Sequence, residues 1–121
     1  LAATDGSIHG DAAVADAVAI AKTCDSSLIV LSVAPSGEEI STAEEIVKQA
    51  MEIASREGVR KEGVILHGKA EDVIVEVAKQ KNAGLILMGS HGRTGLMSVL
   101  MGSVTERVLG HGDTAVLVAK A

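Results

Sequence analysis

The sequence predicts an α/β fold with a doubly wound parallel sheet, because short apolar runs alternate with helical patterns along the chain. The apolar runs are continuous, which is typical of strands that helices cover on both faces. Between these runs, apolar residues recur at the spacing expected for helices of about 10 to 20 residues. Such alternation gives parallel strands joined by right-handed crossovers. No internal repeat is visible, so we interpret the 121 residues as one domain covering 1–121.

The elements are placed by hydrophobic spacing and bounded by turn and cap residues. The predicted strands cover 1–4, 27–33, 63–67, 85–88 and 115–119. The predicted helices cover 11–22, 38–57, 71–81 and a segment that begins at Val104. Each predicted helix therefore connects two consecutive strands, as a parallel sheet requires.

In the first half of the chain, turn residues and caps fix the order of the elements. The first strand, which we expect to be truncated at its N-terminus, turns at once at Asp5. Alanines dominate the helix that follows, and Asp11 places a negative charge at its positive end. The second strand ends at Pro35. Either Ser36 or Ser41 could cap the next helix in a capping box, which leaves its start open by about five residues.

In the second half, Gly58 ends the second helix, and the third helix turns Ile74, Val77 and Ala78 towards one face. The segment 63–70 between them nearly matches the P-loop pattern G-x-x-x-x-G-K-[ST]. The match fails because the intervening residues are strand-like and the last position holds alanine, which lacks the hydroxyl that binds magnesium. We therefore exclude a P-loop there.

Composition excludes several classes of function. The net charge of −5 argues against nucleic acid as a partner, because affinity for a phosphate backbone comes mostly from clustered Lys and Arg. The chain has no Phe, Tyr or Trp, so a purine base would have to be held between aliphatic side chains. No run of about 18 apolar residues could span a membrane. The single Cys24 fits a reducing cytoplasm, where we expect the protein to be located.

The pattern of residues 84–104 predicts a strand, followed by a phosphate-binding loop and the start of a helix. Glycines after the strand would let backbone N–H groups approach a ligand closely. Ser103 lies where a helix N-terminus would offer free N–H groups and positive partial charge to an anion. The same glycines could instead only mark turns between a strand and a helix.

The charges around this stretch favour the phosphate interpretation. No acidic residue lies between Val77 and Thr105, while Lys79, Lys81 and Arg93 do. On this pattern, a phosphate would meet no opposing carboxylate.

Two further residues have two possible roles each. In a doubly wound sheet, ligands bind beyond the carboxyl ends of the strands, where the strand order reverses. If the first and fourth strands are neighbours, this point lies between Asp5 and Gly89. Asp5 could contact a nucleotide or its metal, or it could form the turn and cap the next helix. His91 could donate to a phosphate, or it could face solvent.

The spacing Gly89-x2-Gly92-x9-Gly102-Ser103 resembles the ATP-binding motif of the universal stress protein family, in its nucleotide-binding branch. The opening ATDGS, the strand SLIVLSV and the ending AVLVAK support the resemblance, which spans essentially the whole chain. Gly84 and Ala115 depart from it, because many relatives carry Asp and Pro at these positions.

The resemblance implies a five-stranded sheet of order 3-2-1-4-5 with helices on both faces and ATP across the carboxyl ends of the strands. It also implies Mg or Mn bridging the phosphates, and a homodimer that pairs the last strands, Ala115–Ala119. Adenine and ribose would meet Ala3, Thr4, Asp5, Val33, Met88 and Gly89. The phosphates would meet Gly92, Gly102, Ser103 and Val104, and the loop adds His91 and Arg93 as binding residues.

The sequence pattern and the family resemblance together suggest three candidate functions. The leading one is an ATP-binding stress-response switch or sensor that acts as a homodimer. One alternative is a slow ATPase or a phosphotransferase that needs a partner, for which only Asp5, His91 and Arg93 are candidate groups, so we assign no catalytic residue. The other alternative is a nucleotide-free protein-interaction module.

Overall fold

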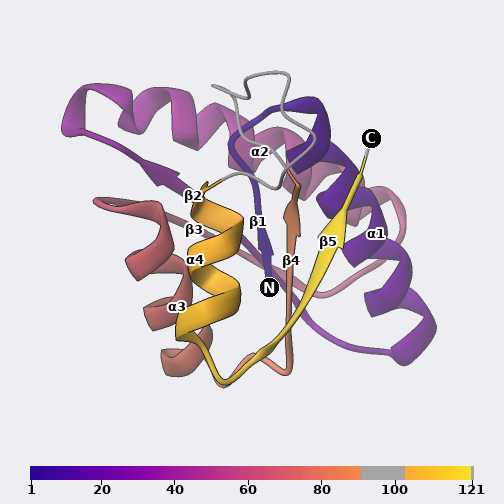
Figure 1. Cartoon of the computed structure of the whole chain (residues 1–121). Helices are drawn as coiled ribbons and strands as arrows, with labels where there is room; N and C mark the ends of the chain where they lie inside the picture. The colour runs from indigo at the N-terminus through magenta and orange to yellow at the C-terminus, as the bar shows by residue number, and fades with distance from the viewer. Residues whose placement is uncertain (91–102, 121) are drawn as a thin grey trace.

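The computed structural model describes residues 1–90 and 103–120, and it contains one parallel sheet with helices on both faces (Figure 1). The strands are β1 (Ala2–Ala3), β2 (Leu28–Ala34), β3 (Lys61–His67), β4 (Leu85–Gly89) and β5 (Ala115–Ala119). The helices are α1 (Ile8–Cys24), the 3-10 turn η1 (Gly37–Glu39), α2 (Ile40–Arg56), α3 (Ala70–Gln80) and α4 (Ser103–His111). Among the described residues, no helix is long and apolar enough to cross a membrane.

The strand order is β3-β2-β1-β4-β5, and every strand pair is parallel, which confirms the order predicted from the family resemblance. Because all strands point the same way, the sheet has a carboxyl end, where the strands finish, and an amino end, where they start. Each helix starts near the carboxyl end and returns the chain to the amino end. The strand order reverses beside β1, so a ligand site is expected at the carboxyl end of β1 and β4.

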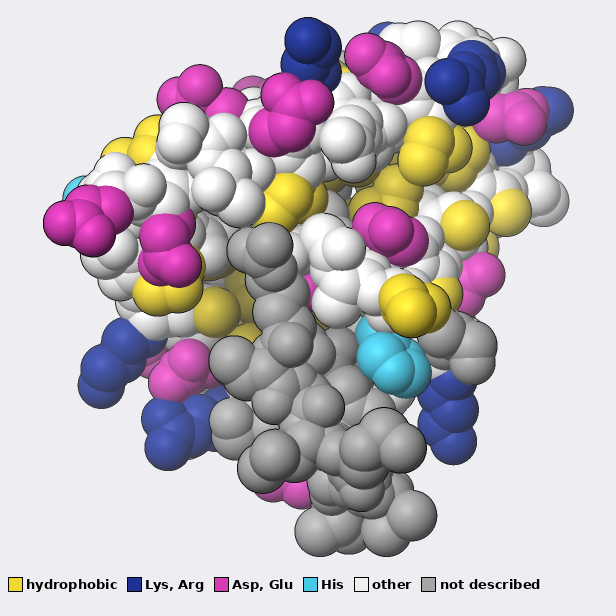
Figure 2. Space-filling view, turned by 90° about the horizontal axis from the view of Figure 1, so that it is seen from above, with side chains coloured by type: hydrophobic (Ala, Val, Ile, Leu, Met, Phe, Trp, Pro, Cys, Tyr) yellow, Lys and Arg dark blue, Asp and Glu magenta, His cyan; other side chains and the backbone are white. Residues whose placement is uncertain are grey.

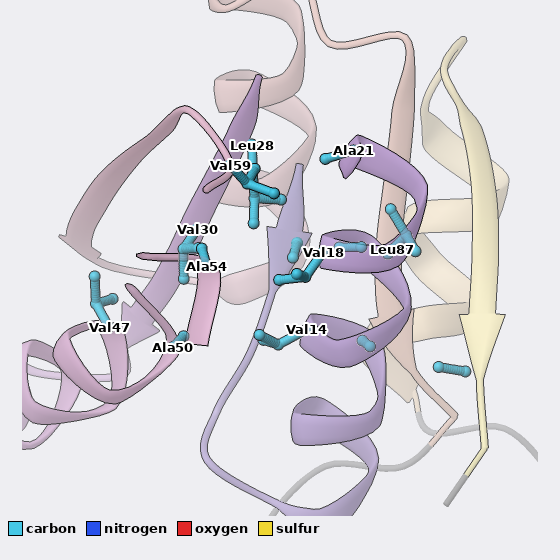
Figure 3. Packing of buried hydrophobic residues seen from close by; sticks show 14 residues of the cluster. Val14, Val18, Ala21, Leu28, Val30, Val47, Ala50, Ala54, Val59 and Leu87 are labelled. Atoms are coloured by element: carbon cyan, nitrogen blue, oxygen red, sulfur yellow. The ribbon is translucent and has the colours of Figure 1, made fainter. Parts of the chain in front are cut away.

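The core has two parts, one on each face of the sheet. On the first face, α1 and α2 pack over the central strands, and Figure 3 shows Val14 and Val18 of α1, Val30 of β2 and Leu87 of β4 in this cluster. Three alanines of α1, Ala13, Ala17 and Ala21, are buried here, and their small side chains let the helix lie close to the sheet. On the second face, Ile74 of α3 and Val108 of α4 pack against Leu31, Ile86 and Met88 of the sheet.

The N-termini of α1 and α2 differ from the predicted ones, because the residues that cap these helices were not identified correctly from the sequence. Helix α1 begins at Ile8 rather than at residue 11, because the Ser7 hydroxyl accepts a hydrogen bond from Gly10 N and caps the helix there. Ser36 precedes η1 with an extended backbone but makes no side-chain capping bond, and Ser41 lies inside α2. Neither capping box is therefore formed. Gly58 ends α2 with a φ of +70°, as predicted.

Candidate nucleotide site

The register of the sheet brings several predicted site residues together at its carboxyl end. Ala3 pairs with Leu31, and Ala2 pairs with Leu87. Continuing each strand by two residues puts Asp5 level with Val33 and Thr4 level with Gly89. The backbone bond from Thr4 N to Leu31 O, at 2.9 Å, continues the pairing of β1 with β2 in this direction.

The turn between β1 and α1 is built from side chains that accept backbone hydrogen bonds. Gly6 N donates to Thr4 Oγ1 at 3.1 Å, and Ser7 N donates to Asp5 Oδ1 at 3.0 Å. A Cβ on Gly10 would lie 2.6 Å from Thr4 Oγ1, so only glycine fits against this turn. Asp5 therefore has the turn-forming role considered above, while Ser7 is the cap; contact of Asp5 with a nucleotide stays a prediction.

Glycine at the end of β4 lets the first turn of α1 lie directly against the strand. A Cβ on Gly89 would lie 2.6 Å from the backbone carbon of His9. Next to this contact, Ser90 Oγ lies 3.2 Å from His9 Nδ1, within hydrogen-bonding distance. Sequence analysis did not identify His9 or Ser90 as neighbours, because 81 residues separate them. The tight contact gives Gly89 a packing role in addition to any contact with a ligand.

Helix α4 starts at the same end of the sheet and is fastened to β4. Thr105 Oγ1 of α4 donates to Gly89 O of β4 at 2.8 Å. The end of β4 is held in turn by β5, because Ser90 N donates to Ala119 O at 3.0 Å. The predicted phosphate-binding residues Ser103 and Val104 form the first turn of α4. The N-termini of two helices, α1 and α4, therefore lie beside the end of β4, and such N-termini attract anions.

The proposed adenine-binding side chains lie on the α3 and α4 face of the sheet. Val33 is half-buried at the border of the core on that face, whereas Met88 is only 5% exposed and packs within it. Ala3 is likewise buried. A base placed here would meet the exposed part of Val33 and the backbone of its neighbours more than the side chain of Met88.

Two of the three basic residues predicted near the site lie far from it, and the third, Arg93, lies outside the described residues. Lys79 lies in the last turn of α3, and Lys81 follows it and pairs with Glu62 at 2.9 Å near the start of β3. Both lysines therefore lie at the amino end of the sheet, the far side from the site. Figure 2 looks onto the carboxyl end and shows side chains of both signs mixed over its described surface. The inference from a charge window in the sequence was thus wrong for these two lysines.

One ion pair near the carboxyl end connects the two helices of the second face. Arg107 Nη1 of α4 lies 2.7 Å from Glu71 Oε1 in the first turn of α3. A hydrogen bond from its own backbone N–H lowers the pKa of Glu71, and Arg107 and Lys69 lower it further, while partial burial acts in the opposite direction. The carboxylate is therefore kept in its charged form.

Eight of the predicted binding residues lie at the carboxyl end of the sheet. They are Ala3, Thr4, Asp5, Val33, Met88, Gly89, Ser103 and Val104. The other four, His91, Gly92, Arg93 and Gly102, lie outside the described residues. Within the described part of the chain, no group of three or more His, Cys, Asp or Glu is arranged to hold a metal ion.

This arrangement defines a class: a doubly wound parallel α/β domain whose candidate site lies where the strand order reverses, between the N-termini of two helices. Within this class the chain belongs to the universal stress protein family, whose model matches residues 1–120. The family membership inferred from the glycine motif is thereby confirmed.

Individual relatives agree with this assignment. Universal stress protein MJ0531 of Methanocaldococcus jannaschii is 37% identical over 133 aligned positions, which cover 97% of this chain and 78% of the relative. A universal stress protein solved in complex with cAMP has a TM-score of 0.82 and 28% identity, covering 98% of this chain and 92% of that one. The universal stress protein of Archaeoglobus fulgidus in complex with dAMP has a TM-score of 0.81 and 25% identity, covering 98% and 94%.

Proposed function

We propose that this protein binds ATP across the carboxyl end of its sheet and acts as a nucleotide-dependent switch or sensor in a stress response. The observation that carries the proposal is the convergence of Asp5, Val33 and Gly89 with the N-termini of α1 and α4 at one place. Solved relatives of the same fold hold cAMP and dAMP, which supports an adenine nucleotide as the ligand.

The residues at this place suit the parts of a nucleotide. The half-buried Val33 offers an aliphatic surface to the base, and Asp5, in the turn after β1, would lie beside the ribose. The first-turn amides of α4, at Ser103 and Val104, would bind phosphate oxygens. Mg or Mn would bridge those oxygens and offset their charge, with the Asp5 carboxylate as the candidate protein group beside it.

A change of nucleotide can act as a signal because it changes the stability of the folded state. A ligand that binds only the folded protein stabilises it in proportion to the logarithm of its concentration. The elements at the site are also fastened to one another, since His9 and Thr105 both contact the end of β4. Binding of a nucleotide would thus stabilise α1, α4 and the sheet together.

We further propose that the protein is a homodimer through β5. This strand pairs with β4 on one side, and its other side borders no further strand in the described sheet. Val116, Leu117 and Val118 are only half-buried there, and an apolar edge strand left uncovered invites association. Sedimentation velocity at increasing concentration tests this: a monomer throughout would rule the dimer out.

The absence of Trp and Tyr allows a direct test for ATP. The purified protein should absorb almost nothing near 280 nm, so a 260 nm peak that remains after gel filtration would report bound nucleotide. Added Mg-ATP should raise the melting temperature, and GTP should raise it less. If no nucleotide is released on denaturation and ATP leaves the melting temperature unchanged, the proposal is wrong.

One variant separates the binding role of Asp5 from its role in the turn. Asp5→Asn keeps an oxygen that can accept from Ser7 N but removes the charge. The variant should melt near the wild-type temperature in the absence of ligand, and its affinity for Mg-ATP should fall about tenfold. Unchanged affinity would remove Asp5 from the site and leave it as a turn residue.

A further inference from the structure

One buried hydroxyl fastens the start of α4 to the end of β4. Thr105 is 3% exposed, and its Oγ1 donates to Gly89 O at 2.8 Å. Gly89 is the last residue of β4, and Thr105 is in the first turn of α4. The bond therefore joins the strand that ends at the proposed site to the helix whose N-terminus lies beside it.

The acceptor of this bond is itself held in place from other directions. The backbone of His9 lies so close that a Cβ on Gly89 would be 2.6 Å from it, and the next residue, Ser90, donates from its backbone N to Ala119 O at 3.0 Å. The Gly89 carbonyl is thus a fixed point of the sheet. Because Thr105 is β-branched and buried, its side chain has few rotamers, and the bond transmits that fixed position to the helix.

The other contacts of α4 leave its position along its own axis less defined. Val108 is fully buried and holds the helix against the sheet, but apolar contact has no preferred direction. The ion pair between Arg107 and Glu71 is also a hydrogen bond, at 2.7 Å, but it ties α4 to α3 and not to the sheet, and water screens the Arg107 side chain, which is 59% exposed. The hydrogen bond of Thr105 is both directional and buried, so it is the contact that fixes the first turn of α4 along the helix axis relative to β4.

We propose that Thr105 is a positioning residue for the phosphate chain of the nucleotide, acting through the backbone amides of Ser103 and Val104. The inference rests on the proposed function. Helix N-terminal amides bind a phosphate only when they point at it, and a displacement of about 1 Å can cost a large part of such an interaction. The adenosine part of the ligand would be held mostly at the ends of β1 and β2, and its contact with Gly89 is fixed also by the packing of His9, so its affinity should depend on Thr105 much less.

The test compares ATP with adenosine by isothermal titration. Thr105→Val keeps the shape of the side chain and removes the hydroxyl. The dissociation constant for ATP should rise about tenfold, whereas that for adenosine should change less than about twofold. Thr105→Ser restores the hydroxyl, and its ATP affinity should return to within about threefold of wild type. Equal loss of ATP and adenosine, or no recovery with serine, would overturn the proposal.

Val108→Ala is the matched control, because it weakens the packing of the same helix without touching the bond to Gly89. It should lower the melting temperature and leave the ratio of ATP to adenosine affinity unchanged. If Val108→Ala loses ATP selectively, as Thr105→Val is expected to, the effect is general loosening of α4 and the positioning role is wrong.

Hydrogen exchange in the nucleotide-free protein separates failure of this inference from failure of the proposed function. Thr105→Val should speed amide exchange at Arg107 and Val108, which bond to the carbonyls of the first turn of α4, at least fivefold relative to wild type, whether or not any nucleotide binds. Wild type that binds ATP together with a Thr105→Val variant of equal ATP affinity would refute only the inference. Wild type that binds no ATP would refute the proposed function, and the phosphate-positioning role of Thr105 with it.

Discussion

The close contacts described at the carboxyl end of the sheet are mostly buried and involve the backbone, whereas three of the four described ion pairs lie at the amino end and are exposed. Thr105 donates a hydrogen bond to a β4 carbonyl. Gly10 packs against Thr4, and Gly89 against His9, so closely that neither glycine could carry a Cβ. At the amino end, by contrast, Lys22 pairs with Glu57, Lys81 with Glu62 and Arg60 with Asp25.

The comparison indicates where the chain needs a fixed geometry. Exposed ion pairs are screened by water and salt and hold two flexible side chains, so they define positions poorly. Buried hydrogen bonds define positions well, because their partners cannot move apart without leaving polar groups unpaired, and the close glycine contacts leave no room for the packed backbones to approach further. The end of the sheet that would hold the ligand is the one built in the second way.

The largest expected effect comes from Gly89, the last residue of β4. Gly89→Ala would place its Cβ 2.6 Å from the backbone of His9 and should lower the free energy of unfolding by about 2 to 3 kcal/mol. Gly84→Ala is the matched control at the amino end, where no described atom lies within 4 Å of the added carbon. Its effect should stay within about 0.5 kcal/mol. Urea denaturation measures both, and equal effects would contradict the comparison.

The next effect distinguishes two serines that precede helical turns at the carboxyl end. Ser7→Ala removes the hydroxyl that accepts from Gly10 N and should cost about 1 kcal/mol. Ser36→Ala removes a hydroxyl that makes no capping bond to η1 and should cost less than about 0.5 kcal/mol. Urea denaturation of the two variants measures both losses of unfolding free energy. A larger loss for Ser36→Ala would mean that the turn after β1 is not held by its cap.

A smaller effect is expected from an ion pair at the amino end. Lys81→Gln breaks the contact with Glu62, in which the two side chains are 40% and 52% exposed. Its cost should be below about 0.5 kcal/mol in low salt and should disappear near 1 M salt. Thermal melts at two salt concentrations test this. A cost that persists in high salt would show that the amino end is held more firmly than its exposure indicates.

The smallest effect concerns Glu71, the one acid of the described ion pairs that lies near the carboxyl end. Its pKa is lowered in the folded protein, so the unfolded chain takes up a proton first as the pH falls. The stabilisation is therefore complete above the ordinary value of 4.5 and is lost as the pH falls below it towards the lowered pKa. The difference in melting temperature between wild type and Glu71→Gln should shrink over that interval. A constant difference from pH 7 to pH 3 would contradict this account.

The order of the elements and the faces they bury could be predicted from the sequence, because these depend on spacing within short segments. β5 was predicted with the boundaries that the structure has, and β2, β3, α2 and α3 differ from prediction by no more than about two residues. The N-cap residues were harder to predict, because several serines are compatible with the start of a helix. Only the surrounding backbone selects Ser7 and leaves Ser36 without a capping bond.

The sequence by itself determined the doubly wound sheet, the family and the glycine motif, since apolar periodicity and residue spacing are local properties. Only the tertiary structure decided which residues meet at the carboxyl end. It brings His9 to Ser90 and Thr105 to Gly89, and it carries Lys79 and Lys81 away. The physical reason is that β4 runs the length of the sheet, about 17 Å for five residues, so residues close in sequence to Gly89 lie at the opposite end.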